Sequence, residues 1–258
     1  MQRSAAAAVA VVAVLVLVAL TSSHPSPSPS PAATVAGSTT PVPGGSASPL
    51  ASSPYTFDDE FDQSSLSPMW GQHLTCCGQV ANVDPGLATV ANGVLTLTLQ
   101  QQADGWHGSL VDTLGTWRQA YGYFAARIKI PRGAGLWPAF WSYAEGGDGE
   151  IDAMEVCGNP VGSHGGDDVS LLHTTVHWEG GSSGHDTRTA DLSQAFHVYA
   201  VDWRPSSLTF YLDGQVVWTY TNAAHIPSAP LPLILDLGVG GSWCGAPTAS
   251  TPSTATLL

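Results

Sequence analysis

Basic residues are scarce in this chain. Only 7 of its 258 residues are Lys or Arg, against 20 Asp and Glu, and the formal net charge at pH 7 is −13. Nucleic acids and anionic membrane surfaces attract proteins largely through Lys and Arg. The composition therefore disfavours both, and we expect no nucleic-acid partner.

Long helical patterns and internal repeats are also absent. Instead, short segments alternate apolar and polar residues and are separated by Gly, Pro, Asn and Asp, as is typical of strands joined by turns. The pair Asp213-Gly214 lies between two such segments and predicts a tight hairpin. These features predict an all-β sandwich of two antiparallel sheets. Strands are expected at residues 94–99, 124–130, 137–143, 149–156, 171–178, 196–203, 207–212, 215–221 and 231–239.

The first 54 residues lack the pattern of a folded domain. A basic residue precedes an unbroken apolar run at 5–20, so residues 1–23 are predicted to be a secretory signal peptide. No clear A-x-A cleavage site follows, and the alternative is an uncleaved N-terminal anchor that tethers the protein to a membrane. Residues 24–54 are rich in Pro and Ser and predict an extended linker. The folded domain is expected at 55–258.

Cysteine is infrequent, with 4 residues, but the predicted export leads to an oxidising compartment where disulfides form. Cys76 and Cys77 are adjacent, and a bridge between them would be strained because neighbouring Cα atoms lie only about 3.8 Å apart. We therefore expect each of them to bond to a distant partner, Cys157 or Cys244. A zinc site is the alternative, but no C-x-x-C spacing supports it.

Acidic residues are depleted in strands, yet three of them occur within one apolar stretch, residues 149–156. Side chains of a strand alternate between its faces, so Glu150 and Asp152 point the same way and Glu155 is out of phase by one residue. One β-bulge between Asp152 and Glu155 would place all three acids on one face. The alternative is a solvated strand with a chance cluster of acids.

Carboxyl groups on one face suit the cleavage of a glycosidic bond. Cleavage with retention needs two carboxyl groups about 5–5.5 Å apart, one as nucleophile and one as acid/base. Long side chains at Glu150 and Glu155 that lean inward could meet this requirement. Crowded like charges also push pKa values apart, so that one acid stays protonated while another is ionised. The chain has 9 Trp, whose flat rings can cover the apolar face of a sugar, and a neutral polysaccharide is not repelled by an acidic protein.

The motif that runs from Glu150 to Glu155, Glu-Ile-Asp-Ala-Met-Glu, resembles the E-x-D-x-x-E signature of glycoside hydrolase family 16, in its bulged, laminarinase-like branch. The resemblance covers roughly Phe57 to the C-terminus. Several motifs in one order make it more specific than the acidic motif alone. The further matching segments are residues 121–131, 135–141, 175–177, 196–199, 202–203, 211–214 and 240–243.

The resemblance implies a β-jelly roll whose concave sheet carries a substrate cleft. It implies that Glu150 is the nucleophile, that Glu155 is the acid/base, and that Asp152 hydrogen-bonds Glu150 and tunes its charge. His177 would lie on the strand beside the acids, within reach of the acid/base or of a sugar hydroxyl.

Three tryptophans are candidates for sugar platforms in such a cleft. They are Trp137, Trp141 and Trp243, of which Trp141 could equally belong to the core. No metal is expected in the site, and no cofactor is expected to be required.

The activity implied is that of a secreted, retaining endo-β-glucanase, a monomer that prefers β-1,3-glucan such as laminarin. One alternative keeps the fold and the acids but acts as a hydrolase or transglycosylase on another polysaccharide such as agar. Another is a catalytically silent glucan-binding protein. The presence of both Glu residues argues against the latter, because binding needs no paired acids.

Two places depart from the family pattern. Tyr123 and Ala125 stand where relatives commonly have Arg and Glu, which removes a salt bridge or a sugar contact. Relatives end with a strand similar to M-L-V-D-Y-V-R-V, whereas residues 254–258 here are Thr-Ala-Thr-Leu-Leu, so we expect the final strand to be missing. The Asp of that strand can help to hold a structural calcium ion, so a calcium site is in doubt.

Overall fold

The computed structural model describes residues 16–19, 55–73, 82–144, 149–158 and 168–258. Strands dominate these residues, and the one α-helix among them, α1 (Gly241–Cys244), has four residues. The all-β class predicted from the alternating segments is confirmed. No helix in these ranges has the length and apolar character needed to cross a membrane. Short 3-10 turns occur at Pro85–Leu87, Asp168–Ser170 and Ala223–His225.

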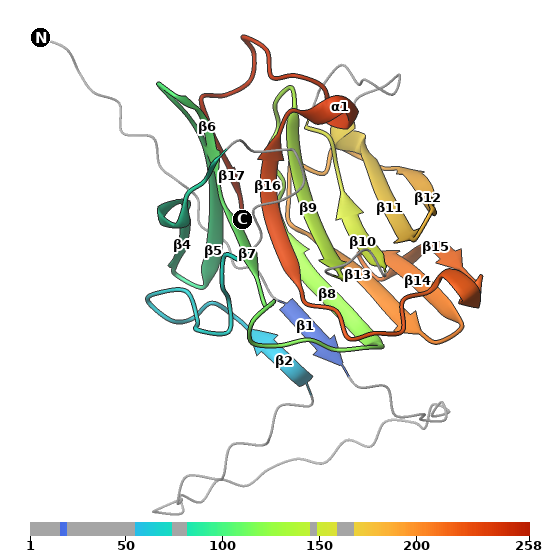
Figure 1. The fold of residues 1–258 in the computed structure, drawn as a ribbon. Helices are drawn as coiled ribbons and strands as arrows, with labels where there is room; N and C mark the ends of the chain where they lie inside the picture. Colours follow the sequence, from blue (N-terminus) through green and yellow to red (C-terminus); the bar gives the residue numbers. More distant parts are fainter. Residues whose placement is uncertain (1–15, 20–54, 74–81, 145–148, 159–167) are drawn as a thin grey trace, which may run out of the picture.

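Two six-stranded sheets make up the body of the protein, and all strand pairs within them are antiparallel (Figure 1). We call the sheet that carries the acids the cleft sheet and the other the back sheet. The cleft sheet has the order β12 (Gly181–Arg188), β11 (Leu171–Trp178), β10 (Glu150–Glu155), β9 (Leu136–Tyr143), β16 (Ile234–Val239), β7 (Leu110–Asp112). The back sheet has the order β15 (Gln215–Tyr220), β14 (Ser207–Leu212), β13 (His197–Arg204), β8 (Gly122–Ile128), β1 (Val16–Ala19), β2 (Tyr55–Asp59).

A third, smaller sheet adjoins these two, and the sequence did not predict it as a separate unit. Its strands β3 and β6 run parallel, whereas its other pairs are antiparallel. It has the order β17 (Thr254–Leu257), β5 (Val94–Gln102), β6 (Gly105–Gly108), β3 (Asn82–Val83), with β4 (Ala88–Ala91) paired to β5.

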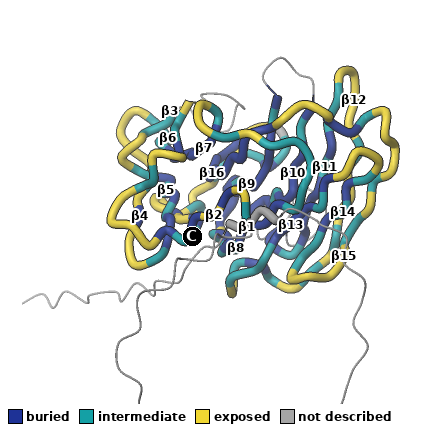
Figure 2. Tube along the Cα trace, turned by 90° about the horizontal axis from the view of Figure 1, so that it is seen from below, coloured by how far each residue is buried: buried dark blue, intermediate teal, exposed yellow. Residues whose placement is uncertain are grey.

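Apolar side chains of the sheets meet in one core. Phe140 and Met154 of the cleft sheet belong to the same buried cluster as Tyr199 and Phe210 of the back sheet. Burying such side chains is the main stabilising term of a sandwich. Figure 2 shows the buried residues along the middle of the strands and the exposed residues mainly at the turns around them.

Residues 254–257 form a short strand, and the absence of the longer final strand of the relatives stays a prediction. Thr254–Leu257 forms β17 and pairs with β5 in antiparallel register. Ala255 and Leu257 are buried while the two Thr side chains are exposed, so the alternation of small polar and apolar residues is itself a half-buried strand. Leu258 then exchanges two backbone hydrogen bonds with Lys129, just beyond β8.

The N-terminal segment has one described element. Val16–Ala19 forms β1, which lies between β2 and β8 in the back sheet (Figure 1). These four residues fall within the segment 1–23 expected to be a signal peptide or anchor. The rest of that segment and the whole expected linker, 24–54, lie outside the described residues. The prediction of export is not tested by this pairing.

The expected disulfide pairing is wrong for the distant cysteines, because Cys157 bonds to Cys244. The reason lies in the strand order. β9 has β10 on one side and β16 on the other, so the residues that follow these two strands meet near Leu136, the first residue of β9. The Cα atoms of Cys157 and Cys244 are 5.2 Å apart, although 87 positions separate them in sequence. Cys76 and Cys77 lie outside the described residues.

Candidate active site

The three acids of β10 lie on one face of the cleft sheet. The register of β10 shifts between Asp152 and Glu155, where three steps along β10 match two along β9 and two along β11. This confirms the predicted β-bulge. The three carboxyl groups consequently line one cleft, whereas Ile151 and Val156 are buried in the core.

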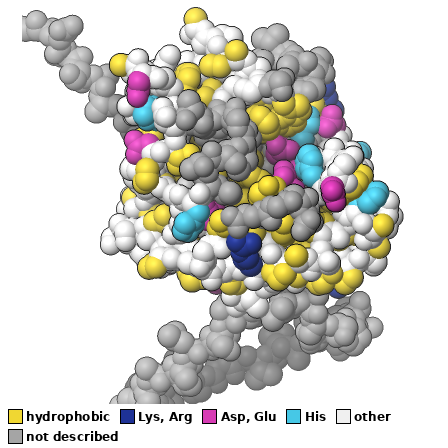
Figure 3. All heavy atoms as spheres, viewed as in Figure 1, with side chains coloured by type: hydrophobic (Ala, Val, Ile, Leu, Met, Phe, Trp, Pro, Cys, Tyr) yellow, Lys and Arg dark blue, Asp and Glu magenta, His cyan; other side chains and the backbone are white. Residues whose placement is uncertain are grey.

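The cleft has a volume of about 460 Å³, which is within the usual range for ligand sites. Figure 3 shows acidic and histidine side chains gathered beside apolar ones on this face of the molecule. Every side chain predicted for the site lines the cleft, so the fold brings the whole predicted set together. The lining residues are Trp137, Ala139, Trp141, Glu150, Asp152, Glu155, His173, Thr175, His177, Ser182, Gly184, Asp186 and Trp243.

Glu155 is held in an environment that favours its protonated form. Burial is the main cause that raises its pKa, to about 7, and the negative charges of Glu150 and Asp236 act in the same direction. Trp137 donates a hydrogen bond from Nε1 to Glu155 Oε1 at 3.0 Å, which lowers the pKa but does not offset the burial. A carboxyl group with such a pKa can donate a proton near neutral pH.

Asp152 and Glu150 point to the same face of β10 and form a hydrogen bond between their carboxyl groups. Asp152 is 2% exposed, and burial followed by the charges of Glu155 and Glu150 raises its pKa well above the ordinary value. Its hydrogen bond with Glu150 raises the pKa of Asp152 and lowers that of Glu150. A protonated Asp152 therefore stabilises the ionised form of Glu150.

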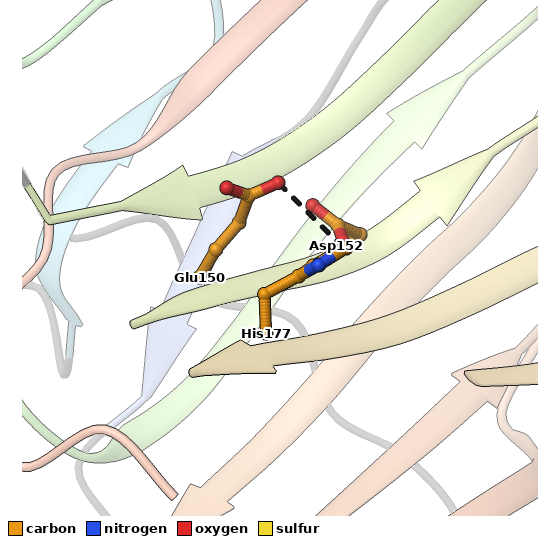
Figure 4. Close-up of side chains that lie close together, drawn as sticks. All are labelled: Glu150, Asp152 and His177. Atoms are coloured by element: carbon orange, nitrogen blue, oxygen red, sulfur yellow. Dashed lines mark ion pairs between the residues drawn. The ribbon is translucent and has the colours of Figure 1, made fainter. Parts of the chain in front are cut away.

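His177 lies on β11 opposite Glu150 and faces both of these acids (Figure 4). Its Nε2 atom is 3.0 Å from Asp152 Oδ2 and 3.9 Å from Glu150 Oε1. Burial raises the pKa of Glu150 overall, and the charge of His177 opposes this effect in part. The imidazole thus contacts the Glu150 end of the cleft and not Glu155.

Two tryptophans form an aromatic wall at the Glu155 end. The rings of Trp137 and Trp243 lie 4.9 Å apart between centroids, and the edge of His173 meets Trp243 at 4.6 Å. Gly241 begins α1 with φ +80°, and a Cβ atom there would lie 3.1 Å from Trp137. Glycine therefore allows α1 to pack over Trp137 and to place Trp243 beside it.

Trp141 has a different position, in the floor of the cleft. It is largely buried, and its Nε1 atom donates a hydrogen bond to Asp236 Oδ1 at 2.8 Å. Trp141 lines the cleft and also packs with Ala139, Leu110 and Ile234, so it belongs to the core as well, and its role as a sugar platform stays a prediction.

A family model described as glycosyl hydrolases family 16 matches residues 79–256, more than half of the chain. The chain belongs to this family. The resemblance read from the acidic motif and its neighbours is confirmed.

Relatives within family 16 include a beta-glucanase of Rhodothermus marinus, 31% identical over 183 residues, which are 61% of this chain and 62% of that protein. Glucan endo-1,3-beta-glucosidase A1 of Niallia circulans is 31% identical over 150 residues, which are 50% of this chain and 21% of that protein. The chain thus spans less than two thirds of these curated relatives.

The fold agrees with a solved structure. The laminarinase catalytic domain of Thermotoga maritima superposes with a TM-score of 0.67 at 25% identity, covering 77% of this chain and 92% of that one. The predicted jelly-roll sandwich of family 16 is confirmed.

Some residues of the family 16 cleft were not predicted. His173 and Thr175 alternate with His177 on β11, and His173 contacts Asp186 with 2.7 Å between Nδ1 and Oδ1. The period of two along β11 could have identified the first two, because it puts them on the face of His177. Asp236 does not line the cleft but accepts the hydrogen bond from Trp141, and it was also missed, although an acid within the apolar strand 234–239 was a visible signal.

One group of side chains in the described ranges could offer several ligands to a metal ion. The ligand atoms of Glu150, Asp152 and His177 all lie within 4.8 Å of one another. The same atoms contact each other as carboxyl and imidazole partners, and the chemistry proposed below needs no metal.

Proposed function

We propose that this chain is a retaining endo-β-glucanase that hydrolyses β-1,3-glucan. The observation that carries the proposal is the pairing of Glu150 and Glu155 on one face of the cleft in different electrostatic surroundings. Glu155 has a pKa raised to about 7. Burial also raises the pKa of Glu150, but less, because its contacts with His177 and Asp152 oppose the effect of burial. One carboxyl group is therefore set to donate a proton while the other is ionised and can attack.

The reaction follows from these two states. Glu155 protonates the leaving glycosidic oxygen while the Glu150 carboxylate attacks the anomeric carbon and forms a glycosyl ester. The ionised Glu155 then takes a proton from water, the water oxygen attacks the same carbon, and Glu150 leaves. Two inversions at one carbon retain the β configuration.

The surrounding residues would support this sequence in separate ways. The hydrogen bond between Asp152 and Glu150 favours the ionised nucleophile, and Trp137 orients Glu155 through its indole N–H. The paired rings of Trp137 and Trp243 offer apolar faces on which a sugar ring can pack. The names of the relatives, a beta-glucanase and a glucan endo-1,3-beta-glucosidase, support a β-1,3-glucan as substrate.

A panel of polysaccharides tests the substrate. Reducing ends released from laminarin, mixed-linkage β-glucan and agarose would be measured with equal enzyme, with Glu150→Gln as the inactive control. We expect laminarin to be cleaved fastest and into oligosaccharides. Faster cleavage of agarose or of mixed-linkage glucan would contradict the β-1,3 preference.

Proton NMR of the first-formed product tests the mechanism. We expect the β anomer to appear first, followed by mutarotation, and an initial α anomer would contradict retention. Isothermal titration would separate catalysis from a purely binding role, because binding heat for laminarin without any released product would indicate a silent glucan-binding protein.

A further inference from the structure

The mechanism above leaves one buried acid of the cleft sheet without a role. Asp236 lies in β16 between Leu235 and Leu237 and is 5% exposed. Its Oδ1 atom accepts the hydrogen bond from Trp141 Nε1 in the floor of the cleft. Burying a carboxyl group costs free energy unless a partner or a proton compensates it, so its presence in an apolar strand calls for a reason.

Asp236 lies in the same cross-strand row as Glu155. Ala139 of β9 is paired with Asp236 on one side and with Glu155 on the other. Directly paired residues point to the same face, and neighbouring strands lie about 4.8 Å apart, so the Cα atoms of the two acids are roughly 10 Å apart. Only the methyl group of Ala139 stands between them in the row, and it carries no charge or dipole to screen them.

We propose that Asp236 is a positioning residue that keeps Glu155 protonated toward neutral pH. This inference rests on the proposed role of Glu155 as acid/base. Asp236 holds Trp141 in the cleft floor and, as it ionises near neutral pH, places a buried negative charge in the row of the acid. A negative charge near a carboxyl group opposes its ionisation, and the effect is strong where water is excluded.

The titration of the two groups supports this role. Burial raises the pKa of Asp236 to about 7, while the hydrogen bond from Trp141 lowers it. The charge of Asp236 in turn raises the pKa of Glu155 and that of Asp152. Because Glu155 and Asp236 titrate in the same range, they lose their protons in two coupled steps rather than independently.

The charge of Glu150 also raises the pKa of Glu155, so the test below removes that charge from both proteins that are compared. Trp141 of β9 is the hydrogen-bond donor to Asp236. The titratable groups on this face of the strands beyond β9 are Glu150, Asp152 and Glu155 of β10, His173 and His177 of β11, and Asp186 of β12. On the other side, β7 places Leu110 opposite Asp236, and the buried Asp112, two residues along β7, lies on the same face. Replacing Asp236 by Asn would keep an acceptor for Trp141 and remove the charge alone.

The test is the titration of Glu155 with and without the Asp236 charge. Carbon NMR of Glu side chains would follow Glu155 in full-length Glu150→Gln protein and in the same protein carrying Asp236→Asn. We expect the pKa of Glu155 to fall by roughly 0.3–1 unit in the second protein, from two charges about 10 Å apart. The alkaline limb of the kcat profile of Asp236→Asn alone should move to lower pH by a similar amount.

The control is Asp112→Asn, which removes another fully buried acid of the same sheet, one that is paired with Ile234 and not with the row of Glu155. This substitution should leave the pKa of Glu155 unchanged. If Asp236→Asn lowers activity equally at every pH, or leaves or raises the pKa of Glu155, the proposal is overturned and Asp236 only supports packing. The NMR titration needs no turnover, so failure of the proposed glucanase activity would be seen separately, as absence of product from the unmutated protein.

Discussion

Individual carboxyl groups in the cleft differ through their surroundings and not through their chemistry. Glu150 and Glu155 have the same side chain, but Glu155 is the more deeply buried and receives a hydrogen bond from Trp137. Asp152, between them, is shielded most and holds its proton most strongly. Burial therefore separates the titration of the two Glu residues, and this supports the proposed roles of Glu155 as acid and Glu150 as nucleophile.

The first prediction concerns these two roles. Glu150→Gln and Glu155→Gln should each lower kcat on laminarin by about 10²–10⁴-fold or more while the melting temperature stays near that of the unmutated protein. Asp152→Asn should cost less and mainly shift the pH profile. For Glu150→Ala, added azide or formate should partly restore turnover and give a product of inverted configuration. Near-normal turnover of Glu150→Gln would show that another group is the nucleophile.

The second prediction concerns the stability cost of Asp236. Its pKa is 3.8 ordinarily and about 7 in the folded protein, so the unfolded chain loses the proton first as pH rises. The contribution of Asp236 to the free energy of unfolding is therefore most favourable below about pH 4. It falls by up to about 4 kcal/mol as the pH rises to 7.

Urea unfolding at pH 4 and pH 8 checks this. Asp236→Asn should be more stable than the unmutated protein at pH 8, with a smaller difference at pH 4. The exposed acid Asp62, changed to Asn, serves as the control and should show little difference at either pH. An Asp236→Asn difference that is the same at both pH values would contradict the shift.

Single strands depend on a few buried positions. β10 needs its bulge to present three acids, and β17 uses only Ala255 and Leu257 to attach the end of the chain to β5. Because only two buried side chains hold this short strand, the loss of either one removes a large part of the free energy that keeps it paired.

The third prediction follows for β17. Leu257→Ala should lower the free energy of unfolding by about 2–5 kcal/mol, because Leu257 is buried against β5. Thr256→Ala is the matched control, since Thr256 is exposed in the same strand and should have a small effect. Urea unfolding of both variants measures the difference, and equal midpoints would show that β17 does not support the sandwich.

The fourth prediction concerns the bond between Cys157 and Cys244. It joins the residues that follow β10 to α1, which carries Trp243. Replacing both cysteines by Ser should cost about 2–4 kcal/mol of stability. It should also raise KM for laminarin with less effect on kcat, because Trp243 would be less well held against Trp137. Unchanged KM and stability would mean that packing alone fixes α1.

At the scale of the whole molecule, the cleft and the described part of the N-terminal segment lie in different sheets. The site lies on β9 to β12 and α1, whereas β1 belongs to the back sheet, between β8 and β2. Changes at β1 should therefore affect stability more than the arrangement of the acids.

The fifth prediction concerns export, which we propose from the apolar run at 5–20. The exported protein should begin near residue 24, so that β1 is lost, and mass spectrometry of its N-terminus measures this. A chain that starts at residue 24 should keep its kcat on laminarin per folded molecule even if it melts lower. An intact N-terminus on protein found at the membrane would instead support an anchor, and loss of folding without residues 1–23 would show that β1 is required.

The amino-acid sequence alone determined the fold class and the composition of the site. Alternation within short segments is local, so it predicted strands, and the phase of Glu150, Asp152 and Glu155 required a bulge that the structure has. The family followed from motifs in order. The side chains that line the cleft near these acids were largely foreseeable for the same reason.

The tertiary structure decided what depends on strand order. β9 lies between β10 and β16, strands far apart in sequence, and this places Asp236 in the row of Glu155 and Cys157 beside Cys244. Pairing between distant strands is not encoded in local alternation. Burial follows from that pairing, and burial raises the pKa of Glu155 to about 7 while the partners of Glu150 oppose the same effect.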